Sequence, residues 1–107
     1  MHMHIRIIRS RSEEMNYHDH GPYILEMIKR ALGGAELAAR CGFREECLTF
    51  MELAKKSTLY LKQIIDVGTQ EEFESHVSKI DDELETYWSR ANKARWNMRK
   101  LTLYPSY

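Results

Sequence analysis

The chain has 107 residues, of which 43% are hydrophobic and 30% are charged, and its 16 basic residues equal its 16 acidic ones. This length suffices for one domain with its own core, and the composition is too apolar for a disordered chain. The balanced charge argues against a strongly basic nucleic-acid-binding protein. No apolar run approaches the roughly 18–20 residues of a membrane span, so we expect no membrane partner.

Cys41 and Cys47 are the only cysteines in the sequence. A secreted chain of this size usually carries more cysteines, paired as a disulfide framework. Both residues fall at apolar positions of predicted helices, which favours packing over catalysis. We therefore expect free thiols and a cytoplasmic protein.

Residues 1–17 are the least regular part of the sequence. A short strand-like run from His4 to Ile8 precedes a polar stretch from Ser10 to Glu14. A single strand has no partner elsewhere in this chain, and terminal segments are commonly poorly ordered unless they are tied down. We expect 1–17 to be a flexible N-terminal arm and 18–107 to be a single helical domain.

The first predicted helix begins near Pro22, because proline suits the first turn of a helix. Three- and four-residue spacing predicts one buried face on this helix. The residues on that face are Tyr23, Ile24, Met27, Ile28 and Ala31. Gly33-Gly34 is expected to end the helix, and Gly42 is expected to end a short second helix over 35–41.

Two long helices are predicted to follow, over about 43–67 and 69–103. Gly68 separates them, and Thr69 and Glu72 form a capping box in which each side chain accepts a hydrogen bond from the other residue's backbone. Pro105 prevents the last helix from continuing. We expect an all-α fold, a small helical bundle built on a long antiparallel helical hairpin of these two helices, with one or two shorter N-terminal helices.

The last predicted helix carries an unbroken heptad pattern that is typical of a coiled coil. Its members are Val77, Ile80, Leu84, Tyr87, Ala91, Ala94, Met98 and Leu101. Beyond about Arg95 the shorter neighbouring helix should end, which would leave apolar residues exposed unless the first helix, a second copy or another protein covers them. The predicted partner-binding surface consists of Arg95, Trp96, Met98, Arg99 and Leu101.

Charge is segregated along the same helix. Seven acidic residues and one basic residue lie between Glu71 and Glu85, whereas five basic residues and no acidic residue lie between Arg90 and Lys100. The helix dipole favours this order, but it acts only over the terminal turns. Antiparallel pairing of two such helices would place opposite charges together, so we expect a homodimer.

No pattern in the sequence indicates a reaction. The pairs His2/His4 and His18/His20 could ligate a metal, but they lack a spacing that places both ligands on one helix face and lack further ligands at a known spacing. There is also no glycine-rich phosphate loop. We expect no catalytic residues, no metal site, no cofactor and no enzymatic activity.

These observations favour a non-enzymatic protein–protein interaction protein that acts through a helical surface, such as an adaptor, a chaperone, an immunity protein or a phage- or plasmid-type inhibitor or regulator. The alternative is a small nucleic-acid-binding transcriptional regulator that uses the basic C-terminal helix. Bases interleaved with an aromatic residue can contact phosphates and stack on nucleobases. The residues for this alternative are Arg90, Lys93, Arg95, Trp96, Arg99 and Lys100.

Overall fold

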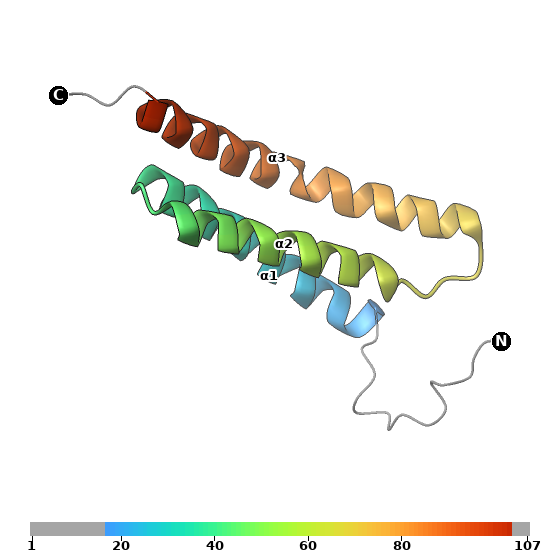
Figure 1. Ribbon diagram of the computed structural model, residues 1–107. Helices are drawn as coiled ribbons and strands as arrows, with labels where there is room; N and C mark the ends of the chain where they lie inside the picture. The colour runs from blue at the N-terminus through green and yellow to red at the C-terminus, as the bar shows by residue number, and fades with distance from the viewer. Residues whose placement is uncertain (1–16, 104–107) are drawn as a thin grey trace.

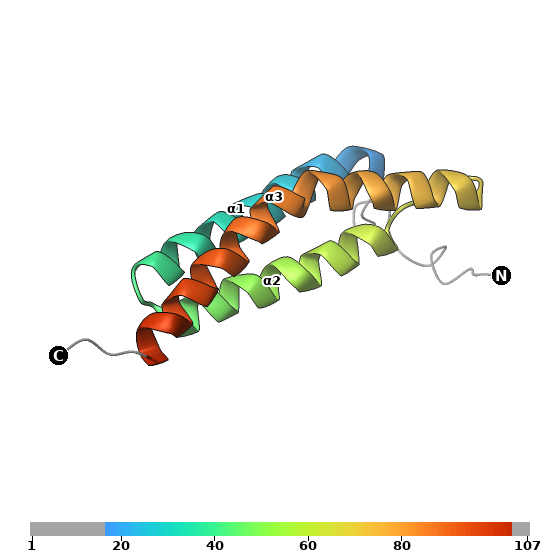
Figure 2. The same ribbon diagram turned by 90° about the horizontal axis from the view of Figure 1, so that it is seen from above.

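The computed structural model describes residues 17–103, with side chains described as far as residue 98 (Figure 1). This range forms three helices, α1 (Tyr17–Arg40), α2 (Arg44–Gln63) and α3 (Gln70–Leu103). They run up, down and up, so α1 and α3 are parallel and α2 is antiparallel to both (Figures 1 and 2). The predicted all-α bundle is confirmed. The predicted arm lies outside the described residues except for Tyr17, which begins α1.

Helix α1 continues through Gly33-Gly34, where the sequence predicted a break, and that prediction was wrong. Leu32 and Ala35, on either side of the two glycines, are buried. Their packing outweighs the cost of roughly 1 kcal/mol for each glycine inside a helix. Gly34 also permits a close approach, because a Cβ atom there would lie 3.1 Å from the Phe50 ring of α2. As a result α1 has 24 residues and is longer than α2, which has 20.

Gly42 terminates α1, as its position in the sequence predicts. Its φ angle is +81°, in the left-handed region that glycine tolerates best. The Gly42 N–H donates to the Ala39 carbonyl at 3.1 Å, and the Phe43 N–H donates to the Ala38 carbonyl at 2.8 Å. These two bonds form a Schellman motif, which satisfies carbonyls at the helix end and turns the chain into α2.

The predicted capping box at the start of α3 is confirmed. The Glu72 N–H donates to Thr69 Oγ1, and the Thr69 N–H donates to Glu72 Oε1, each at 3.1 Å. Helix α2, however, ends at Gln63 rather than near Gly68. Ile64 and Ile65, which extended the apolar pattern in the sequence, lie in the connecting loop. They are partly buried and pack against the core from there.

Each helix contributes a row of buried residues at alternating spacings of three and four, and α1 also buries Leu32 and Ala39 beside its row. The row of α3 follows the predicted heptad at Ile80, Leu84, Ala91, Ala94 and Met98. The row of α1 is Ile24, Ile28, Ala31, Ala35 and Ala38, and that of α2 is Cys47, Met51, Ala54 and Leu61. Thr58 falls in the α2 row, and its hydroxyl donates to the Ala54 carbonyl at 2.7 Å.

Among residues 17–103, no helix combines the length and the hydropathy that crossing a membrane requires.

Helix α3 packs mainly on α1 and much less on α2. The sequence instead predicted that the N-terminal half of α3 would pack on the 43–67 helix. The difference arises because the unbroken α1 offers a long apolar row parallel to α3, and ion pairs align the two helices. Lys29 Nζ lies 3.1 Å from Glu83 Oε1, and Arg90 Nε lies 3.3 Å from Glu36 Oε1.

Candidate functional site

The predicted partner-binding surface on the C-terminal half of α3 is only partly exposed. Met98 is 6% exposed, and it borders a hollow that Ala39 and Arg40 of α1 also line. The first helix, one of the three covers that the sequence left open, therefore lies beside Met98, because α1 extends to Arg40 without a break. Trp96 is 53% exposed and Arg95 is half-buried. The side chains of Arg99 and Leu101 lie outside the described part of the chain.

The described basic residues of the same half-helix do not converge on one face. Arg90 is directed to α1, where Glu36 contacts both it and Arg40. Arg95 lies about 140° further around the helix at 100° per residue. Burial raises the pKa of the Cys47 thiol in α2, and the positive charge of Arg95 partly opposes that rise. Arg95 therefore lies on the α2 side of α3. Lys93 is exposed, and the side chain of Lys100 is outside the described range.

Part of the charge segregation of α3 is matched within the chain. Its acidic half meets Lys29 of α1 through Glu83 and meets Lys62 of α2 through Asp81, whose Oδ1 lies 2.8 Å from Lys62 Nζ. Its basic half meets Glu36 of α1 through Arg90. Three of the segregated charges that suggested an antiparallel homodimer therefore have partners within the monomer.

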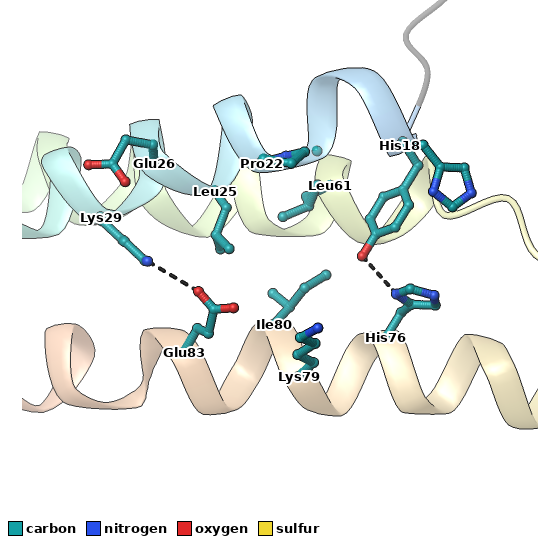
Figure 3. A pocket seen from close by; sticks show the side chains of 12 residues that line it. His18, Pro22, Leu25, Glu26, Lys29, Leu61, His76, Lys79, Ile80 and Glu83 are labelled. Carbon is teal, nitrogen blue, oxygen red and sulfur yellow. Dashed lines mark hydrogen bonds and ion pairs between the residues drawn. The ribbon is translucent and has the colours of Figure 1, made fainter.

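A cleft of about 420 Å³ lies between the N-terminal halves of α1 and α3 (Figure 3). Two polar pairs span it. The Tyr17 hydroxyl lies 3.0 Å from His76 Nδ1, with the two rings edge to face, and Lys29 pairs with Glu83. The apolar part of the lining consists of Pro22, Leu25, Leu61 and Ile80.

The surroundings of this cleft keep the Tyr17 hydroxyl and the Lys29 amine protonated. Burial, and then the negative charge of Glu83, raises the pKa of the Tyr17 hydroxyl. The hydrogen bond to Glu83 is the main cause of the raised pKa of Lys29. Both shifts are opposite to those that would activate a nucleophile, so the two pairs act as ties between α1 and α3. In the described residues, no group of three or more His, Cys, Asp or Glu side chains could hold a metal ion.

A row of exposed apolar side chains follows the outer edge of the α1–α2 contact, and we call it the α1–α2 seam. It consists of Tyr23 and Met27 of α1 and Phe50, Leu53 and Tyr60 of α2, all exposed. On α1, Tyr23, Met27 and Gly34 are spaced by four and seven residues, which places them on one face of the helix. On α2, Phe50, Leu53 and Tyr60 are spaced by three and seven residues and also share one face. The contact between Gly34 and Phe50 shows that the two faces meet.

The seam faces away from α3. Lys29 on α1 and Lys62 on α2 mark the sides that α3 covers, since both form ion pairs with it. At 100° per residue, the seam residues lie roughly 120–180° around their helices from these lysines. Figure 1 shows α3 lying over one side of the α1–α2 pair. Nothing in the described part of the chain covers the other side, where Tyr23 is 68% exposed.

The sequence reasoning missed this surface because it placed Tyr23 and Met27 on the buried face of the first helix. That placement was wrong, since Ile24 and Ile28 are buried while Tyr23 and Met27 are not. The available signal was the width of the apolar arc on this helix, which exceeds what a single packed face requires.

Neither a scan against protein-family models nor searches of curated proteins and of solved structures found a match to this chain. A function is therefore assigned from the surfaces described above.

Proposed function

We propose that this chain is a non-enzymatic interaction protein that binds a protein partner through the α1–α2 seam. The observation that carries the proposal is the exposure of five large apolar side chains along one side of a folded helix pair. Side chains of this size present about 150–250 Å² each when fully exposed, so their exposed parts amount to roughly 360–600 Å². A patch of that size on a small protein is commonly a site of association.

The chemistry of the seam suits a protein partner better than a nucleic acid. Tyrosine, phenylalanine and methionine are enriched in protein interfaces. Arg30 on α1 and Lys56 on α2 are basic residues beside the seam, and each lies 4.0 Å from a glutamate carboxylate, Glu26 and Glu52 respectively. Phosphate binding requires several converging basic groups, whereas Arg90 and Arg95 of α3 are directed to different neighbouring helices. An adaptor, an inhibitor or another regulator of a protein target fits this surface.

In-cell photocrosslinking tests the proposal, with a photoreactive amino acid placed at position 53 or at position 59. Leu53 belongs to the seam, whereas Leu59 lies about 120° around α2, and the two are 50% and 54% exposed. We expect a discrete crosslinked protein product from position 53 and much less from position 59. Equal products from both positions, or none from position 53, would contradict the proposal.

A further inference from the structure

We infer that the partner held by the α1–α2 seam is a second copy of this chain, so that two copies associate seam to seam. This inference rests on the proposed function and names its partner. It moves the predicted self-association away from α3, where Asp81, Glu83 and Arg90 already pair with other helices of the monomer.

The charge of the seam permits contact between identical surfaces. Eight positions make up its two faces: 23, 27, 30 and 34 on α1, and 50, 53, 57 and 60 on α2. Arg30 is the single charged residue among them and lies beside Glu26, and the oppositely charged Glu52 and Lys56 border Leu53. The whole chain also has a formal net charge of zero. Two copies can therefore approach seam to seam without the repulsion that a charged surface would impose on itself.

The shape of the seam is compatible with a two-fold pair. Its residues at one end are bulky, with Tyr23 on α1 and Tyr60 on α2, and its other end contains Gly34 beside Phe50. A two-fold axis across the middle of the seam places the tyrosine end of one copy against the glycine end of the other. Identical surfaces related in this way form a closed dimer rather than a filament.

The exposed area suits a weak dimer. The five side chains expose roughly 360–600 Å² per copy, so two facing seams would bury about 700–1,200 Å² in total. Stable interfaces bury about 1,200–2,000 Å² in total, and weak, transient ones bury less, so the seam corresponds to the weaker class. Helix α3 does not obstruct this contact, because Lys29 and Lys62, which pair with α3, lie on the far sides of their helices from the seam.

Sedimentation of the purified full-length chain tests the inference, with Leu53→Lys as the seam variant and Leu59→Lys as its matched control. Both substitutions replace a half-exposed leucine of α2, so both should leave the helical circular dichroism signal of the monomer unchanged. The 12.7 kDa chain should form a dimer between about 1 and 100 μM. A lysine in the middle of the interface should weaken the dimer about tenfold or more, whereas Leu59→Lys should not.

Three results would overturn the inference: an unmodified chain that stays monomeric over this range, a Leu53→Lys dimer as strong as the unmodified one, or equal weakening by both variants. A monomeric chain that still crosslinks to another protein from position 53 would reject the second copy and keep the proposed function. A product that contains only this chain, together with a dimer that Leu53→Lys weakens, would support both.

Discussion

Alanine at Gly33 tests whether α1 is one continuous helix. Gly33 lies inside α1, and a Cβ atom added there meets nothing within 4 Å. Alanine is more stable than glycine in a helix interior by roughly 0.5–1 kcal/mol. Gly33→Ala should therefore raise the free energy of unfolding by about this amount, which corresponds to an increase of about 2–6 °C in Tm.

The same substitution at two other glycines supplies the controls. Gly42 also has open space around it, but its φ of +81° makes Gly42→Ala cost about 1–2 kcal/mol through backbone strain alone. Gly34→Ala gains the same helix propensity as Gly33→Ala, yet its Cβ would lie 3.1 Å from the Phe50 ring, which would have to move. We expect stability to decrease in the order Gly33→Ala, Gly34→Ala, Gly42→Ala.

Urea denaturation followed by circular dichroism measures these differences. All variants should be compared at one protein concentration, because association would make apparent stability depend on concentration. A Gly33→Ala variant that is less stable than the unmodified chain would refute the continuous helix. It would indicate instead that the chain breaks at these two glycines, as the sequence alone predicts.

Three further predictions concern the cap, the thiols and Met98. Thr69→Ala should lower the free energy of unfolding by about 1 kcal/mol, because it removes the acceptor of the capping box, whereas Thr69→Ser should nearly preserve it in the same urea assay. A thiol reagent should label the exposed Cys41 of the folded protein at neutral pH, and should label Cys47 only on unfolding. Cys47 is buried and the pKa of its thiol is raised, so rapid labelling of both thiols would contradict this burial. Met98→Asp should destabilise the monomer by about 2–4 kcal/mol, through the lost packing of a buried side chain and the desolvation of a carboxylate. If Met98→Asp weakened association and left stability unchanged, Met98 would be a partner contact.

The parts of the fold that depend on nearby residues could be predicted from the sequence. The heptad of α3 identified Ile80, Leu84 and Met98 as members of a packed row, because the spacing of apolar residues determines which side of a helix is buried. The start of α3 followed from the hydrogen-bonding capacity of Thr69 and Glu72. Both depend on a few neighbouring residues and not on the tertiary arrangement.

The choice of packing partner could not be predicted in the same way. A heptad shows that α3 has a buried row, but it does not show whether α1 or α2 covers that row. The continuity of α1 across Gly33-Gly34 depends on tertiary packing that its own sequence does not reveal.

The candidate site was missed for a related reason. The wide apolar arc of α1 has two flanks, and only the position of α3 decides which flank remains exposed. The apolar spacing of the sequence therefore predicted that Tyr23 and Met27 are core residues, although they lie on the exposed flank.

The two ion pairs between α1 and α3 have a consequence for the alignment of these parallel helices. Glu36 follows Lys29 by seven residues, as Arg90 follows Glu83, so both pairs repeat with the period of the apolar row. A slip of α3 by one heptad would preserve that period, but one direction would bring Arg90 opposite Lys29 and the other would bring Glu83 opposite Glu36. Partly exposed pairs of this kind add at most about 1 kcal/mol to stability, yet each slipped alignment would exchange an attraction for a repulsion. Two ordinary surface contacts thereby select one alignment from three that the apolar period alone would allow.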